Sequence, residues 1–331
     1  MGPEKACRPE GVAEVAGSVD VVTLGETMVA LVPEGRGPLR RVRRFRRHIA
    51  GAETNVAIGL TRLGHRARWL GRVGDDAFGA VILETLALEG VDTRWAVRDP
   101  AAPTGLMFKE RPVSGDSSSL YYRRGSAASL QDAEQIDAAA FADPRWLHLT
   151  GITPALGPGP RRAVTRALDL ARSGGLAVSF DPNYRAALWG RAEAASALRP
   201  LAEQADVLVF SPLEGEILYG AGTVEALAAR ALAVGRATLV AVKDGVRGAI
   251  LFPAAGSPVA IAPHPVRAVD TTGAGDAFVS GLLAGLLDGM SLRRAGRLAA
   301  LCGALACTVL GDWEGVPRRA EAEAWLAGGE P

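Results

Sequence analysis

The stretch Asp270-Thr271-Thr272-Gly273-Ala274-Gly275-Asp276-Ala277-Phe278 ends a polar loop and opens an apolar run that reaches Leu287. Gly273 and Gly275 leave backbone N–H groups uncovered where a helix should begin, and such a helix start, with its positive dipole end, binds anions. Asp276 falls in the first turn, close enough to accept a proton from a hydroxyl group that attacks a phosphorus atom. The stretch therefore predicts a phosphate site with a general base beside it.

A lone Gly-x-Gly followed by aspartate is more often the glycine-rich entry of a capped, buried helix than a catalytic site. The full nine-residue string is much rarer, and it resembles the second signature of the PfkB, or ribokinase-like, carbohydrate kinases. In that family the aspartate is the catalytic base and the Gly-Ala-Gly backbone holds the transferring phosphoryl group. The resemblance thus implies catalytic roles for Asp276, Gly273, Ala274 and Gly275.

The bulk properties are those of a globular chain without a strongly charged partner. It has 331 residues, a net charge of +1 and 22% charged residues, enough for one large α/β domain or two small ones. Three cysteines cannot build a disulfide framework, and four scattered histidines give no metal-site spacing. The longest apolar runs, at 277–287 and 298–310, fall short of the ~18 residues that span a bilayer. We expect a flexible tail at 1–19, no membrane partner and a cytoplasmic location.

Short apolar runs alternate with helical segments along most of the chain, which predicts right-handed βαβ units. The predicted strands are Asp20–Glu26, Arg68–Gly74, Trp146–Leu149, Ala177–Phe180, Val207–Phe210 and Leu239–Val242, followed by a hairpin of Ala249–Phe252 and Val259–Ala262. We expect an α/β fold, doubly wound around a mostly parallel sheet with helices on both faces. By the family resemblance, residues 20–331 form a single ribokinase-like domain with a small β-sheet lid from about 33–48 and 103–125.

Two segments near the N-terminus have competing interpretations. The run 50–57 opens a helix whose small residues let a ligand approach Gly51, and Asn55 offers a donor and an acceptor to a polyol. By itself the run is better explained by simple packing, but it matches the first signature of the resembled family. The run 40–47 holds six arginines, which can mark nucleic-acid contacts. Because no basic helix or aromatic platform supports that function, we expect a charged edge strand and no nucleic-acid partner.

Two arginines are candidates for choosing the substrate. Arg185 follows a predicted strand, where open α/β sheets bind ligands, and its guanidinium can bind a carboxylate through two hydrogen bonds. A surface ion pair is the alternative. On the predicted lid strand, alternation sends Tyr121 and Arg123 to the same face. With Arg123 on the predicted lid and Arg185 at the edge of the mostly parallel sheet, the site would suit a substrate that carries both hydroxyl groups and an acid group.

At four further segments the chain looks like the 2-keto-3-deoxygluconate kinases within this family. These segments are Tyr121-Tyr122-Arg123-Arg124-Gly125-Ser126-Ala127, the run 147–156, Asp181-Pro182-Asn183-Tyr184-Arg185 and Gly311-Asp312-Trp313-Glu314-Gly315. The resemblance implies that the sugar acid is contacted by Gly51, Tyr121, Arg123, Arg185, Asp276 and Asp312. The two arginines would hold its carboxylate.

The resemblance also implies ATP and Mg²⁺. The segment 243–249, with Lys243, Gly245 and Gly248, resembles the turn that carries the adenosine side of the ATP site, although a tight hairpin turn would need the same glycines. Ser211 stands where many relatives carry an asparagine near magnesium, and Glu214 could reach the ion through water. Met107 replaces a tyrosine of close relatives, and Ala300 replaces a polar residue on the nucleotide side.

The sequence thus predicts transfer of the γ-phosphoryl group of ATP to the terminal hydroxyl of 2-keto-3-deoxygluconate. Fructose, ribose or the galactonate epimer as acceptor would keep the fold and change the substrate. A non-enzymatic nucleic-acid-binding or regulatory protein that uses the arginine run is the distant alternative. We also expect a homo-oligomer, with a dimer formed through the free edges of the lid.

Overall fold

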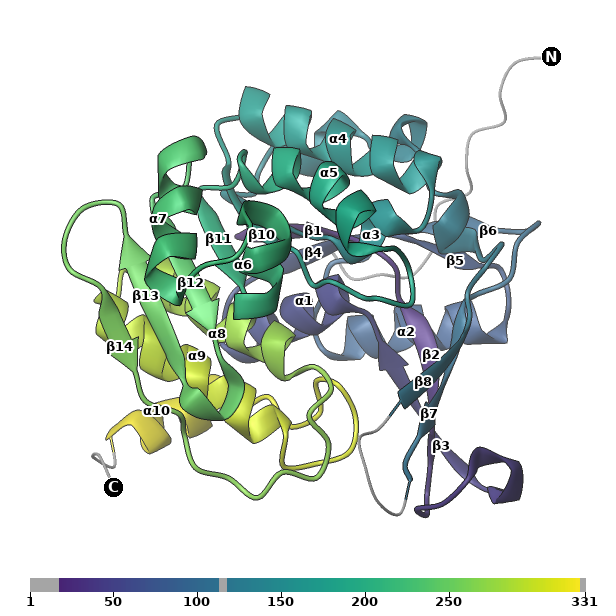
Figure 1. Cartoon of the computed structure of the whole chain (residues 1–331). Coiled ribbons are helices and arrows are strands. Elements are labelled where there is room, and N and C mark those ends of the chain that lie inside the picture. Colours follow the sequence, from purple (N-terminus) through teal and green to yellow (C-terminus); the bar gives the residue numbers. More distant parts are fainter. Residues whose placement is uncertain (1–17, 113–117, 328–331) are drawn as a thin grey trace.

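The protein is built around one large sheet with helices on both faces, and a smaller sheet stands to one side (Figure 1). The computed structural model describes residues 18–112 and 118–327. Most of the predicted tail at 1–19 lies outside these ranges, but Val19 is buried and its N–H donates to Asp143 Oδ2 at 3.2 Å. The predicted boundary of the tail at residue 19 is therefore slightly too late, because Val19 already packs with the domain.

The large sheet has eight strands in the order β14-β13-β12-β11-β10-β9-β1-β4. Its strands from β4 to β12 are parallel, while β12–β13 and β13–β14 pair antiparallel. The doubly wound fold and the closing hairpin are thus confirmed. The strands are β1 (Val21–Leu24), β4 (Ala67–Leu70), β9 (Trp146–Thr150), β10 (Ala177–Asp181), β11 (Val207–Phe210), β12 (Leu239–Lys243), β13 (Ala249–Pro253) and β14 (Val259–Ile261).

Two cores separate the layers, because neighbouring residues of each central strand point to opposite faces. One core packs the sheet against α1 (Ala52–Arg62), α2 (Ala77–Leu88), α8 (Ala274–Leu287), α9 (Leu292–Ala306) and α10 (Arg319–Ala327). The other packs it against α4 (Pro158–Ser173), α5 (Arg191–Ala202), α6 (Pro212–Tyr219) and α7 (Val224–Val234), and α3 (Ile152–Ala155) follows β9. Within the two described ranges no single helix could cross a bilayer by length and apolar character, although the bent pair α6–α7 could together.

The small sheet has four strands in the order β3-β2-β7-β8. They are β2 (Met28–Pro33), β3 (Phe45–Ala50), β7 (Leu106–Glu110) and β8 (Ser118–Tyr122), so the sheet includes 28–32 and 49–50, beyond the predicted segment 33–48. The charged edge strand predicted from the run 40–47 is confirmed only in part: β3 is terminal and exposes Arg46 and Arg47, but it begins at Phe45, and Leu39–Arg41 form a 3-10 helix instead.

The prediction of one strand at Arg68–Gly74 was wrong. Only β4 joins the large sheet, whereas β5 (Arg72–Gly74) pairs with β6 (Val97–Asp99) in a separate ribbon. The break falls at Gly71, where an added Cβ would lie 1.9 Å from the Trp69 ring. The ring of a fully buried tryptophan therefore fills the space that a side chain at this position would need.

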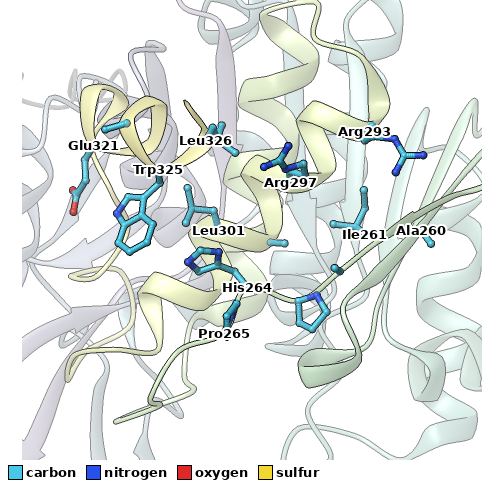
Figure 2. A pocket seen from close by; sticks show the side chains of 14 residues that line it. Ala260, Ile261, His264, Pro265, Arg293, Arg297, Leu301, Glu321, Trp325 and Leu326 are labelled. Carbon is cyan, nitrogen blue, oxygen red and sulfur yellow. The ribbon is translucent and has the colours of Figure 1, made fainter. Parts of the chain in front are cut away.

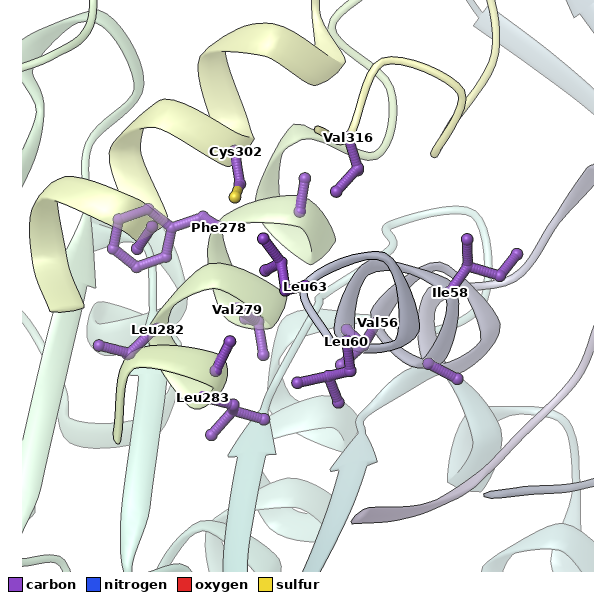
Figure 3. Close-up of a cluster of buried hydrophobic side chains, with 14 of the residues drawn as sticks. Val56, Ile58, Leu60, Leu63, Phe278, Val279, Leu282, Leu283, Cys302 and Val316 are labelled. Atoms are coloured by element: carbon purple, nitrogen blue, oxygen red, sulfur yellow. The ribbon is translucent and has the colours of Figure 1, made fainter. Parts of the chain in front are cut away.

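Close packing fixes helix α8 between α1 and α9, as Figure 3 shows for the side chains at their contact. A Cβ on Gly281 would lie 2.8 Å from Ala299 Cα, and one on Gly285 would lie 2.7 Å from Ala295 Cα. These small residues let the α8 and α9 backbones approach closely, which holds the first turn of α8 in place at the edge of the sheet.

Candidate active site

A cavity of about 720 Å³ lies between the small sheet and the carboxyl ends of the large sheet's strands. Met28, Met107 and Tyr121 line it from the small sheet. From the large layer, Lys243 lines it at the end of β12 and Asp276 lines it in the first turn of α8. It brings together most of the predicted site residues: Gly51, Asn55, Tyr121, Arg123, Arg185, Ser211, Glu214, Lys243, Gly273, Gly275, Asp276 and Asp312. Ala274, Gly245 and Gly248 are not among its lining residues.

Asp276 is buried at the floor of this cavity and is held by two asparagines. Asn55 Nδ2 donates to Oδ2 at 2.8 Å, and Asn183 Nδ2 donates to Oδ1 at 3.0 Å. Burial raises the pKa of Asp276 to about 6, although the Asn55 hydrogen bond and the charges of Arg185 and Lys243 oppose the rise. A carboxylate with a raised pKa that stays ionised near neutral pH is suited to general-base catalysis.

The glycine turn, residues Gly273–Gly275, forms the N-terminus of α8. Gly273 is in the left-handed region at φ 79°, and an added Cβ would lie 1.8 Å from the carbonyl oxygen of Asp312. A Cβ on Gly275 would lie 3.0 Å from Lys243 Nζ. The turn therefore exposes backbone amides beside a fixed cation, as an anion site requires.

The Lys243 side chain lies beside the glycine turn. It forms an ion pair with Asp181, and the attraction of Asp181 and Glu214 outweighs burial, so its pKa is raised above the ordinary lysine value. Lys243 is thus a permanent positive charge beside the glycine turn. The sequence predicted that the segment 243–249 carries the adenosine side of an ATP site, and that assignment stays a prediction.

Arg123 and Arg185 both line the cavity, but their charges are balanced differently. Arg123 lies over the Tyr121 ring, 5.4 Å from its centroid, and pairs with the buried carboxylate of Glu26. Burial raises the pKa of Glu26, although Arg123 and a hydrogen bond from Ser126 oppose the rise. Arg185 is exposed, and its guanidinium forms no hydrogen bond or ion pair with residues in the described ranges, although its charge opposes the rise in the pKa of Asp276. Its guanidinium is therefore the one of the two that is free to bind an anion.

Comparison with known proteins identifies the family. A family model described as pfkB family carbohydrate kinase matches residues 19–319. The chain belongs to the pfkB family. It is therefore a phosphotransferase that acts on an alcohol group of a sugar.

Several relatives bear on the substrate of this pfkB kinase. The 2-dehydro-3-deoxygluconokinase of Thermoproteus tenax is 40% identical over 93% of this chain and 94% of its own length. The enzyme of the same name from Bacillus subtilis (strain 168) is 37% identical over 93% of this chain and 96% of its own length. A fructokinase from Klebsiella pneumoniae is also 37% identical, over 89% and 95%. Sequence similarity alone thus leaves two acceptor classes.

A solved structure bears on the phosphoryl donor. A putative ribokinase II from E. coli, in complex with ATP and Mg²⁺, matches with a TM-score of 0.88 and 30% identity, over 94% of this chain and 100% of that one. In the pfkB kinase described here, the predicted magnesium residue Glu214 already accepts hydrogen bonds at both oxygens. Tyr184 N donates to Oε1 at 2.8 Å, and Ser211 N donates to Oε2 at 2.7 Å.

Ser211 and Glu214 together form a capping box that opens α6. In the described ranges no group of three His, Cys, Asp or Glu residues could hold a metal ion. A carboxylate oxygen accepts more than one hydrogen bond, so Glu214 still fits an ion that keeps most of its own water.

A second cavity of about 960 Å³ lies between the loop after β14 and helices α9 and α10 (Figure 2). His264 meets Trp325 edge to face at 5.2 Å, and Arg297 and Ala300 line it from α9. Gly248 adjoins this cavity, because a Cβ there would lie 2.1 Å from the Ile261 carbonyl oxygen. Gly248 and its turn therefore lie beside a cavity distinct from that of Asp276.

Four functional candidates were missed by the sequence reasoning: Glu26, Lys109, Asp181 and Asn183. Asn183 and Asp181 lie in the same quoted segment as Arg185, so the strand-end rule that selected the arginine could have found them. Asn183 has φ 41°, uncommon for a residue other than glycine. Glu26 ends a predicted strand, so the same strand-end rule could have found it, whereas Lys109 had no local signal because its partners lie far away in the sequence.

Proposed function

We propose that this pfkB kinase transfers the γ-phosphoryl group of ATP to the terminal hydroxyl of 2-keto-3-deoxygluconate, giving the 6-phosphate. The observation that carries the proposal is Arg185, whose guanidinium forms no hydrogen bond or ion pair in the described ranges and shares a cavity with the buried carboxylate of Asp276. A substrate carboxylate would supply the missing partner. The two named relatives with the same activity support this choice over a neutral sugar.

The apolar side of the cavity supports a deoxy sugar. Met28 and Met107 present thioether side chains to the cavity from neighbouring strands of the small sheet. A thioether is a weak hydrogen-bond acceptor and no donor, so a sugar hydroxyl against it would lose the hydrogen bonds it makes in water. The CH₂ group at C3 of the keto acid has no such requirement.

Asp276 would act as the general base. Its carboxylate would accept the proton of the terminal hydroxyl as that oxygen bonds to the γ-phosphorus and the bond to the ADP leaving group breaks. Asn55 and Asn183 orient the carboxylate through its two oxygens. The amides of the glycine turn and the ammonium of Lys243 would stabilise the charge on the phosphoryl oxygens. Mg²⁺, when bound, neutralises phosphate charge, and Glu214 would hold it through water.

The second cavity is the proposed site for the base of the nucleotide. Pro263, Ala300 and Leu301 give it an apolar wall, and Gly248 lies beside it on the turn that follows Lys243. The triphosphate would then extend from the turn that contains Gly248 toward the glycine turn, Gly273–Gly275. The small side chain at Ala300 leaves room for the base without offering it a hydrogen bond.

We also propose a cytoplasmic homodimer that forms through the small sheet. On the face opposite Met107, the Phe108 ring meets Phe45 and Tyr122, each at 5.7 Å, and Tyr122 is 61% exposed. Sheets with an exposed aromatic face and free edges commonly pair across a two-fold axis. Sedimentation of wild type and Tyr122→Asp tests this: a monomeric wild type, or an unchanged dimer in the variant, would contradict it.

The test of the acceptor is Arg185→Ala. Removing a charge-assisted hydrogen bond to a carboxylate, worth about 1.5–3 kcal/mol, should lower kcat/KM for the keto sugar acid by about 10- to 100-fold. The low activity that we expect toward fructose should fall less, because for that acceptor the Arg185 charge acts only through the pKa of Asp276. Arg191→Ala, an exposed arginine on α5 outside the cavity, is the matched control.

Fructose phosphorylation is the second candidate. Glu26 already balances the charge of Arg123, so this arginine does not require an acidic substrate, and the Klebsiella fructokinase is as similar to the chain as one of the keto sugar acid kinases. Arg185→Ala with an unaltered rate toward the keto acid, or a wild type that prefers fructose, would favour it.

A further inference from the structure

Lys109 lies in the small sheet, yet its ammonium group reaches the loops that support the glycine turn. On β7 the side chains of Met107 and Lys109 lie on the same, buried face of the strand, and Lys109 is 2% exposed. Its Nζ donates to Asp270 Oδ2 at 2.9 Å and to Asp312 Oδ1 at 2.5 Å. One buried cation therefore joins two carboxylates, and it does not line the cavity itself.

Both carboxylates are directly connected to the glycine turn. Asp270 Oδ1 accepts hydrogen bonds from Thr272 N at 3.1 Å and Thr272 Oγ1 at 2.7 Å, so it fixes the residue before Gly273. Asp312 lies on the other side, with its carbonyl oxygen where a Cβ on Gly273 would be. A displacement of either aspartate would move the backbone amides that face the phosphate.

The charges in this cluster depend on Lys109. Burial would raise the pKa of Asp270, but Lys109 outweighs it and holds that pKa below its ordinary value. Burial raises the pKa of Asp312 despite Lys109. Without the ammonium group, two buried carboxyl groups would face each other with no counter-charge, and they would separate or take up protons.

A second set of contacts joins the small sheet to the loop of Asp312. His48 Nδ1 lies 2.5 Å from Glu314 Oε1, and Trp313 Nε1 donates to the Ile49 carbonyl oxygen at 3.2 Å. Strand β3 therefore holds the same loop that β7 reaches through Lys109. The position of the small sheet and the shape of the glycine turn are mechanically linked.

We propose that Lys109 is a positioning residue that couples the small sheet to the glycine turn, so that the turn is correctly shaped for phosphoryl transfer only when the sheet is docked. The proposal rests on the phosphotransferase activity of the family and not on the choice of acceptor. Its test therefore uses whichever acceptor the wild-type protein phosphorylates fastest. If the keto sugar acid is not a substrate, the proposal for Lys109 is unaffected.

The primary test is Lys109→Ala, assayed at a temperature at which circular dichroism shows it folded. Misplacement of the phosphate-binding amides should lower kcat by about 100-fold, with a smaller effect on the KM for the acceptor. Ethylammonium, which fits the space left by the side chain, should restore part of kcat, whereas sodium chloride at the same ionic strength should not. A purely structural role would give no such rescue.

Arg111→Ala is the matched control, because Arg111 is a cation directly after β7 that donates to the Pro33 carbonyl oxygen and has no contact with Asp270 or Asp312 among the described hydrogen bonds and ion pairs. It should keep wild-type kinetics. A folded Lys109→Ala with wild-type kcat, or with a loss that ethylammonium does not change, would overturn the proposal.

If Lys109→Ala does not fold, Lys109→Arg decides the question, since it retains the charge but places a planar group where a compact one is needed. We expect it to fold with reduced kcat. Wild-type kcat in Lys109→Arg would then contradict the proposed positioning role.

Discussion

Replacing Asp276 with asparagine should stabilise the folded protein at neutral pH while removing most of its activity. Burial raises the pKa of this carboxyl from 3.8 to about 6. The difference of about two pKa units, at about 1.4 kcal/mol each, corresponds to about 3 kcal/mol. Because the folded-state pKa is the higher one, wild-type stability is lost as pH rises from about 4 through about 6, and the full cost applies above that. An asparagine stays neutral and avoids this cost.

The local hydrogen bonds determine how much of this free energy is recovered. Asn55 Oδ1 and Asn183 Oδ1 are both buried without a partner among the described residues. If Asn183 rotates its amide, Oδ1 can accept from the new side-chain NH₂ while Asn55 continues to donate. We therefore expect a gain in the free energy of unfolding of about 1–3 kcal/mol at neutral pH and almost none near pH ~4.

Urea denaturation at both pH values measures the gain, and a coupled assay of ADP release measures kcat, which should fall by about 10²- to 10⁴-fold. Asp169→Asn, at an exposed position on α4, is the control for loss of a carboxylate. A variant less stable than wild type at neutral pH, or a gain of equal size at both pH values, would refute the claim that the ionised carboxylate is destabilising.

Three further predictions concern the same reaction. The acid limb of the pH profile of kcat/KM should have an apparent pKa near 6. Asn55→Ala should move this limb to higher pH, because Asn55 stabilises the ionised form of Asp276. A limb at lower pH in Asn55→Ala than in the wild type would contradict the assignment of the limb to Asp276. Gly275→Ala should lower kcat by about 10²-fold or more, since its Cβ would meet Lys243 and narrow the anion site; wild-type kcat would exclude that site. Ala300→Phe should raise the KM for ATP but not that for the acceptor, and an unchanged KM for ATP would show that the base binds outside the second cavity.

The parts of the site that depend on one continuous segment could be predicted from the sequence. The nine residues that end at Phe278 contain both the glycine turn and Asp276, so their proximity follows from the chain itself. The alternation of short apolar runs with helical segments likewise predicted the parallel sheet, because buried parallel strands appear in a sequence as continuous apolar runs. The break at Gly71 was not predictable, because it depends on how the Trp69 ring packs.

The electrostatic pairing in the site could not be predicted, because the partners are distant in sequence. Lys109 meets Asp312 across a separation of 203 residues, and Asn55 meets Asp276 across 221. Arg123 matched the expected carboxylate site by type and position, yet its charge is already balanced by Glu26. Residue type indicates what a side chain can bind, and only the fold decides whether that capacity is already used.

The measurement that tests the account most directly is the initial rate of ADP formation by the wild-type enzyme with 2-keto-3-deoxygluconate and with fructose under identical conditions. We predict a higher kcat/KM for the keto sugar acid, with the phosphate on its terminal hydroxyl. A higher kcat/KM for fructose would contradict the assignment of Arg185 as the residue that selects the substrate.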